Sequence, residues 1–220
     1  SPYFPYLNIE LLVNTAVNPI IHPQPADGTS SVSIIDASII KAKNKRLKKG
    51  KHTDNTQDNE ASYASKKDSS GKVKTTCGFK INLNCDEDSF VKNFKTTTAN
   101  IHDSESFTDL LIGHESAVYA ASGTKAKPID YLAQHEPPIN NHIYDEHSVI
   151  NPLQAAETYQ YSKEPNQNMV ERVFGHFKLR YGTNKTRHLG LMPFHINTLL
   201  ASMVNNLKTA LSLKKKYGLA

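Results

Sequence analysis

Residues 31–40 read SVSIIDASII, a β-branched apolar run that holds a single acid, Asp36. The turn signal Asp-Gly-Thr at residues 27–29 precedes it, and a short apolar run bounded by a turn predicts a strand that is buried on both faces. A carboxylate inside such a strand is costly to bury unless something compensates for its charge, which a metal ion would do. The local sequence also allows an aspartate at a strand end, where it would be solvated or would hold a turn.

The next segments predict an antiparallel hairpin. Residues 78–85, GFKINLNC, alternate between apolar and polar side chains, which is the pattern of a half-buried strand. The acidic turn at residues 86–89 leads into FVKNFKTTT at residues 90–98, whose aromatic and β-branched residues favour a returning strand. The polar residues of the first strand, at positions 80, 82 and 84, are then expected on its open face.

Short elements follow the hairpin. Asp103 or Ser104 can cap a short helix that ends near Gly113, because short polar side chains and glycine are favoured at the two ends of helices. SAVYAAS at residues 116–122 predicts another short strand.

Helices dominate the remainder of the chain. Pro128 suits the first turn of a helix that runs through Leu132, whereas residues 136–166 give no clear period. Apolar side chains recur at helical spacing over residues 170–177 and 196–211, which predicts two closing helices. The order of strands and helices predicts a mixed α/β domain with a partly antiparallel sheet.

The composition favours one main domain without cross-links. The 220 residues are 38% hydrophobic, and no apolar run approaches the roughly 18 residues that would span a membrane. The first residues lack the pattern of a secretory signal, so we expect a cytoplasmic protein. Cys77 and Cys85 would lie roughly 26 Å apart on an extended segment, too far for a disulfide, which agrees with a reducing compartment.

The charge distribution favours a polyanionic partner. The net charge is +5 and the pI is about 9.0. Residues 41–51 hold seven basic side chains in eleven positions, and a polar stretch with few aliphatic residues follows. We therefore expect a long basic loop over residues 41–75. Such a loop can contact DNA phosphates, since each neutralised phosphate releases counterions, but a solvated surface loop has the same composition.

A second acid stands out in the predicted helix near residue 170. Glu171 precedes Lys178 by seven residues, so the two side chains lie two turns apart on nearly the same face of a helix. Such a pair can present an acid and a base to one site, although an exposed glutamate beside an apolar stripe gives the same pattern. The ten histidines include no pair at zinc spacing, and the chain has neither a phosphate-binding loop nor a serine-nucleophile elbow.

Six blocks of the chain stand in order at plausible spacing: SVSIIDASII, TQDNEASYASKK, CGFKINLNCDED, TTTANIHDSESFTDLL, AVYAASG and VERVFGHFKLRYGTNKTRHLGL. Together they resemble successive blocks of the DDE-type insertion-sequence transposases of bacteria. The resemblance runs from about residue 27 to the C-terminus, with only residues 136–166 unmatched.

This resemblance implies a ribonuclease-H-like fold, an α/β domain in which helices flank a mixed sheet. The catalytic domain would span residues 27–220, and residues 1–26 would be the remnant of an N-terminal helical region. In this family two aspartates and a glutamate hold two divalent ions, Mg²⁺ or Mn²⁺. The matching blocks make Asp36 the first aspartate, Glu171 the glutamate and Lys178 the basic residue of the same helix.

The resemblance also implies a partner and a place in the cell. The partner would be the double-stranded DNA of insertion-element ends, in the bacterial cytoplasm at the nucleoid, with no membrane involved and a homo-oligomer left open. The basic residues expected to contact DNA are Lys43, Lys45, Arg46, Lys48, Lys49, Lys178, Arg180, Lys185 and Arg187.

The chain departs from the family pattern at the second aspartate, where it has Ala121. It also has Thr124 in place of an aromatic residue and Met169 in place of an arginine, and it lacks the glycine usual in the turn after Asp88. Because metal-binding acids act as a unit, we expect little or no strand transfer. The alternative is a non-catalytic DNA-binding relic that competes with an intact transposase or modulates it.

Overall fold

The computed structural model describes residues 31–43, 58–67, 70–113, 115–120, 132, 134, 139–143 and 168–217. None of the helices in these ranges is long and apolar enough to cross a membrane. Cys77 and Cys85 are both free, as the sequence predicts.

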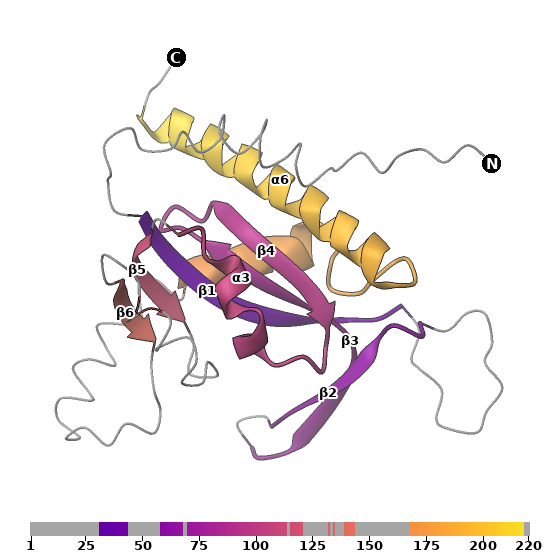
Figure 1. The fold of residues 1–220 in the computed structure, drawn as a ribbon. Helices are drawn as coiled ribbons and strands as arrows, with labels where there is room; N and C mark the ends of the chain where they lie inside the picture. The colour runs from indigo at the N-terminus through magenta and orange to yellow at the C-terminus, as the bar shows by residue number, and fades with distance from the viewer. Residues whose placement is uncertain are drawn as a thin grey trace, which may run out of the picture.

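A six-stranded mixed sheet forms the centre of the fold, with its strands in the order β2-β3-β1-β5-β6 and β4 paired with β3 (Figure 1). Strand β1 (Ser31–Lys41) pairs antiparallel with β3 (Val73–Cys85) and parallel with β5 (Glu115–Ala120). The predicted hairpin is confirmed, because β4 (Val91–Thr98) returns antiparallel along β3. β1 therefore lies between the antiparallel and parallel parts of the sheet, which is the expected ribonuclease-H-like α/β arrangement.

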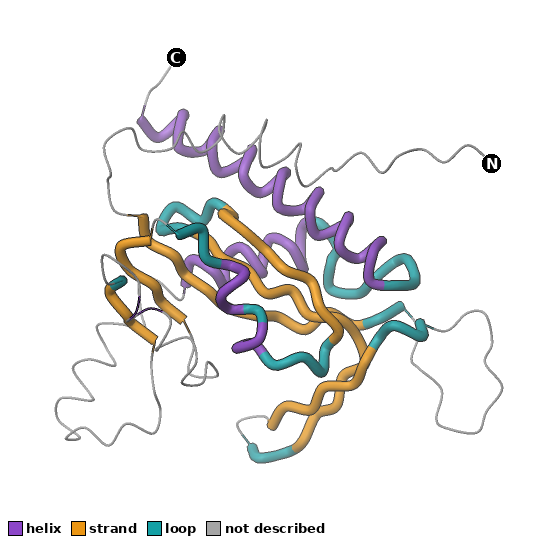
Figure 2. The backbone as a smooth tube through the Cα atoms, in the orientation of Figure 1, coloured by secondary structure: helices purple, strands orange, loops and turns teal. Residues whose placement is uncertain are grey.

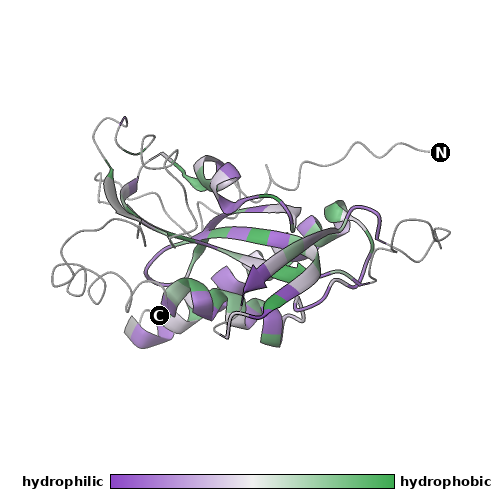
Figure 3. Cartoon of the chain, turned by 90° about the horizontal axis from the view of Figure 1, so that it is seen from below, coloured by the Kyte–Doolittle hydropathy of each residue, from purple (hydrophilic) through white to green (hydrophobic). Residues whose placement is uncertain are grey.

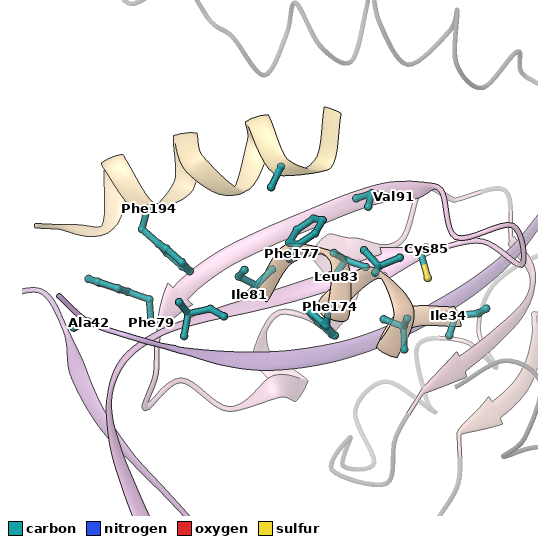
Figure 4. Packing of buried hydrophobic residues seen from close by; sticks show 14 of the residues in the cluster. Ile34, Ala42, Phe79, Ile81, Leu83, Cys85, Val91, Phe174, Phe177 and Phe194 are labelled. Atoms are coloured by element: carbon teal, nitrogen blue, oxygen red, sulfur yellow. The ribbon is translucent and has the colours of Figure 1, made fainter. Parts of the chain in front are cut away.

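Helices cover both faces of the sheet (Figure 2). On one face, a helix over residues 168–175 continues as a π-helical turn, His176–Arg180 (η3), and α6 (Leu191–Tyr217) packs beside it. Figure 4 shows the aromatic side chains of these helices packed against the apolar side chains of β3. Phe79 of β3 stacks on Phe194 of α6, with 5.1 Å between the ring centroids. On the other face, the short helix α3 (Phe107–Leu110) buries its two ends against β1 and β5.

The polar side of β3 is buried, so the prediction of a half-buried strand is wrong. Lys80, Asn82 and Asn84 are 9%, 2% and 0% exposed. The segment 101–110 covers them and supplies acceptors: Asn84 Nδ2 donates to the Leu110 carbonyl at 2.9 Å, and Lys80 Nζ donates to Asp103 Oδ1 at 2.6 Å. Polar side chains with such partners can be buried at little cost.

The N-cap and the polar loop also differ from the predictions. The N-cap is His102 and not Asp103 or Ser104. The ring of His102 accepts from the Ser104 backbone N–H and caps the 3-10 turn Asp103–Glu105 (η2), which precedes α3.

Within the expected loop 41–75, strand β2 (Ser62–Lys67) pairs antiparallel with β3. The stretch 136–166, which gave no clear period, contributes β6 (Asn140–Ile143), parallel to β5. Residues 1–26 and Pro128 lie outside the described residues.

Helix α6 does not bury the apolar stripe predicted over residues 196–211. Most of that stripe is exposed, including Leu200 and Leu207, and Figure 3 shows apolar and polar residues interspersed along the helices. The face toward the sheet is largely polar instead, because Asn206 closes the open edge of β4: its side chain accepts from the Val91 N–H at 2.8 Å and donates to the Val91 carbonyl at 2.9 Å. A backbone N–H and a carbonyl at a buried sheet edge both need partners, and Asn206 supplies them.

The turn after Asp88 contains a residue other than glycine in a left-handed backbone conformation. Ser89 has φ +71°, the left-handed conformation that glycine adopts without steric cost. Its carbonyl accepts from Asn205 Nδ2 at 2.9 Å, and its hydroxyl donates to Met169 Sδ at 3.6 Å. Two departures from the pattern that the resemblance implies, one in the turn after Asp88 and one at Met169, are thus in contact.

Ser89→Gly is expected to stabilise the fold by about 0.5–1 kcal/mol, because relief of the left-handed strain exceeds the added freedom of the unfolded chain. Urea denaturation of the variant measures the gain. Ser89→Ala is the control, since it removes the hydroxyl but keeps the strain; an equal gain in both variants would contradict the explanation.

Candidate active site

Asp36 lies in the middle of β1, opposite Leu83 of β3. On the other side of β1, the parallel pairing brings Ala120, the last residue of β5, opposite Ile35. The carboxyl end of β5 therefore reaches the neighbour of Asp36. Ala121, where the family pattern has its second aspartate, follows Ala120 in sequence and lies outside the described residues.

The environment of Asp36 disfavours its charge. Burial raises the pKa of this carboxyl to about 6, and the backbone N–H of Ala37 opposes that rise. The negative charges of Asp103 and Glu171 raise the pKa further, while Lys66 lowers it. A carboxylate that is largely desolvated and near other acids would be stabilised by an added cation.

Glu171 and Lys178 project from the helix that packs on the same face of β1. That helix turns Val173, Phe174 and Phe177 into the core, which leaves Glu171 exposed at its border. Lys178 reaches inward from η3, and its Nζ donates to Ser38 Oγ at 2.5 Å.

The charge of Lys178 is coupled to the same site. Burial lowers the pKa of Lys178, the Asp36 carboxylate raises it, and the nearby charge of Lys66 lowers it. Lys178 thus contacts Ser38, two residues from Asp36, while Glu171 acts on Asp36 only through its charge, which raises the pKa of Asp36 least among the causes.

A third acid does not complete the site among the described residues. The charge of Asp103 raises the pKa of Asp36 more than the charge of Glu171 does, but the Asp103 carboxylate is held in a 2.6 Å ion pair with Lys80. No group of three His, Cys, Asp or Glu side chains that could hold a metal occurs in the described part of the chain. Asp36 and Glu171 remain two oxygen donors of a kind that suits a hard divalent cation.

The end of β1 gathers basic residues from two distant segments. Lys41 forms a parallel bridge with Lys185, and the Thr186 N–H donates to the Lys41 carbonyl at 2.8 Å. The Lys43 N–H in turn donates to Thr186 Oγ1 at 2.7 Å. The side chains of Lys41, Lys43 and Lys185 are all exposed, so they form one positive surface.

Arg187 extends this surface. A Cβ on Gly182, which has φ +69°, would lie 2.8 Å from Arg187 Nη2, so the absence of a side chain at Gly182 leaves room for the guanidinium. Arg180, at the end of η3, is also exposed. The other basic residues predicted to contact DNA, Lys45, Arg46, Lys48 and Lys49, lie outside the described residues.

Two residues near Asp36 were not predicted from the sequence. Ser38 receives the Lys178 hydrogen bond, and the charge of Lys66 reaches both Asp36 and Lys178. The two-residue spacing from Asp36 places Ser38 on the same side of the strand, which is a signal that could have been used. No local signal marks Lys66, because its nearness depends on how β2 pairs with β3.

Asp36→Asn is expected to stabilise the metal-free protein at neutral pH. Because the pKa of Asp36 rises from 3.8 to about 6 on folding, ionisation costs the folded state roughly 2 kcal/mol after a discount for remaining solvent exposure. The cost is complete above the folded pKa and disappears as the pH falls below the unfolded pKa. Urea denaturation in EDTA should show the full gain near about pH 7.5 and little gain near about pH 3.5; a gain independent of pH would contradict this account.

A model of one protein family matches this chain. Its description is transposase DDE domain, and it covers residues 27–207, which include Asp36, Glu171 and Lys178. Neither the curated proteins nor the solved structures include a match. Since the family model spans most of the 220 residues, the chain belongs to the transposase DDE domain family.

Proposed function

We propose that this protein binds the DNA of insertion-element ends in the bacterial cytoplasm, and that its centre for DNA cleavage and joining is incomplete. The observation that supports the proposal is that Lys178 hydrogen-bonds to Ser38 beside Asp36, on the strand that pairs with the carboxyl end of β5, while the charge of Glu171 acts on Asp36. Acids from a central strand and a flanking helix can hold divalent cations beside a phosphate.

Asp36 and Glu171 would hold Mg²⁺ or Mn²⁺, since both offer carboxylate oxygens and Asp36 is poorly solvated. When bound, a pair of such ions activates the attacking oxygen and stabilises the leaving oxygen in phosphoryl transfer. Ala121 has no side-chain carboxylate where the family pattern has its second aspartate, so we expect weak metal binding and little cleavage.

Lys178 would orient the scissile phosphate. Its ammonium lies on the site side of η3 and is fixed by Ser38, so a positive charge is held near Asp36 without forming a direct ion pair in the described contacts. Burial lowers its pKa, and an approaching phosphate would favour its protonated form. The chain therefore keeps the group that positions DNA even though one metal-binding acid is missing.

The surface of Lys41, Lys43, Lys185 and Arg187 would bind the DNA backbone. These exposed side chains lie together at the end of the strand that carries Asp36, so duplex bound there would run toward the site. Phosphate contacts of this kind position DNA without reading its sequence.

Fluorescence anisotropy with a labelled duplex that carries terminal inverted repeats tests the binding. We expect affinity that falls steeply with salt, as counterion release requires, and a preference over a scrambled duplex of equal length. Absence of binding at low salt would refute the proposed function.

The alternative, a non-catalytic protein that competes with an intact transposase, is favoured by Ala121. This alternative predicts that the unaltered chain lowers the DNA cleavage by an active transposase of the same element. The reduction should be proportional to the fraction of element ends that the unaltered chain occupies. Unchanged cleavage at saturating occupancy would exclude it.

A further inference from the structure

Strand β2 and the first half of β3 form a two-stranded ribbon, which we call the basic ribbon (residues 62–67 and 73–78). Ser62 pairs with Gly78 at its base, and Lys67 pairs with Val73 near its tip. Figures 1 and 2 show it extending away from the sheet, on the side opposite α6. Most of its side chains beyond the base are exposed.

The ribbon places like charges against each other. Lys66 lies directly opposite Lys74, and Lys67 adds a further exposed ammonium group near the tip. The two paired strands contain no acid. Opposite like charges destabilise an antiparallel pair, so a phosphate bound beside Lys66 and Lys74 would relieve their mutual repulsion.

The ribbon is hydrogen-bonded to the chain after β1 at its base, and the charge of one of its lysines acts on the candidate active site. The Ala42 N–H donates to the Cys77 carbonyl at 3.0 Å, and the hydroxyls of Ser65 and Thr75 are 2.9 Å apart across the strands. Lys66 is the ribbon residue whose charge reaches both Asp36 and Lys178. Its cross-strand partner Lys74 therefore shares the face of the ribbon that carries Lys66.

We propose that the basic ribbon is a DNA-gripping arm whose Lys66 and Lys74 contact two backbone phosphates of the duplex that enters the active site. A two-stranded ribbon is narrow enough to lie along or within the roughly 12 Å wide major groove. Its lysine and hydroxyl side chains suit phosphate oxygens, so the contact would position the duplex and would not select its sequence. This inference rests on the proposed function, because it requires that the protein bind DNA.

Anisotropy titrations of Lys66→Gln/Lys74→Gln against the unaltered chain test the arm. We expect the slope of log affinity against log salt to become shallower by about 2, so that between 50 and 200 mM salt the unaltered chain loses about tenfold more affinity than the variant. Lys214→Gln/Lys215→Gln is the matched control, since it removes two exposed charges at the far end of α6 (Figure 1).

Equal slopes for the ribbon variant and the unaltered chain would overturn the proposed arm while leaving DNA binding intact. An equally shallow salt slope in the α6 control variant would also overturn the proposed arm, because the change would then reflect the lower net charge of the protein. If the unaltered chain binds no duplex, both the arm and the proposed function fail.

Lys74→Glu gives a second readout that a purely structural role would not produce. A carboxylate opposite Lys66 replaces repulsion with attraction, so the melting temperature of the free protein should rise while its DNA affinity falls at least as far as in the double glutamine variant. A rise in melting temperature with unchanged affinity would refute the arm.

Discussion

Gly78→Ala is expected to destabilise the fold by about 3–5 kcal/mol, the largest effect of any single methyl group added to the described glycines. A Cβ on Gly78 would lie 1.9 Å from the Ile40 carbonyl oxygen and 2.9 Å from its carbon. Both atoms belong to the backbone of β1, so no side-chain rotation relieves the overlap. The strands must separate or bend where β1, β3 and the basic ribbon meet.

Gly175→Ala is the control for this prediction. Gly175 is helical, and a Cβ there would meet nothing within 4 Å, so alanine should stabilise the chain by about 0.5–1 kcal/mol. Urea denaturation of both variants gives the comparison. If the two substitutions change stability equally, the close approach of β1 and β3 is not what requires glycine at position 78.

The close contact at Gly78 could not be predicted from the sequence. The alternation of GFKINLNC predicts the strand correctly, but its glycine carries no local mark of the close approach to Ile40. The burial of Asn84 depends likewise on the Leu110 carbonyl, 26 positions away in sequence. Contacts of this kind are set by tertiary packing, which a local pattern does not encode.

The two faces of α6 illustrate a related limit. Helical spacing predicts the helix, yet it favours the apolar side as the buried one. The sheet instead requires Asn206 at the open edge of β4, where Val91 has a donor and an acceptor to satisfy. Strand β2 was missed because a ribbon exposed on both faces shows no apolar alternation.

The candidate site was more accessible from the sequence. Two local signals point to the site: an acid inside an apolar strand, and an acid seven residues before a lysine on a helix. The order of the blocks that resemble the transposase family assigned both acids to one site. The structure adds what those signals could not contain: the Ser38 contact of Lys178, the charge of Lys66 near Asp36, and the ion pair between Asp103 and Lys80.

Ala121→Asp is expected to raise metal-dependent nicking of insertion-element ends by about a thousandfold or more, because the metal-binding acids of such a site act as a unit. The pairing of Ala120 with Ile35 brings the end of β5 beside the residue that precedes Asp36. The new carboxylate would restore the second aspartate of the family pattern, directly after the described end of β5. The assay follows nicking of a labelled duplex with Mg²⁺ or Mn²⁺.

Two controls separate metal binding from other effects of the new side chain. Ala121→Asn has nearly the same size as the aspartate variant but lacks its charge, and it should remain inactive. Adding Asp36→Asn to Ala121→Asp should remove the gain, since the new acid can work only with the first one. Robust nicking by the unaltered chain would show that a third acid is dispensable. An Ala121→Asp protein that binds DNA and metal but does not nick would show that the missing aspartate is not the cause of the lost activity.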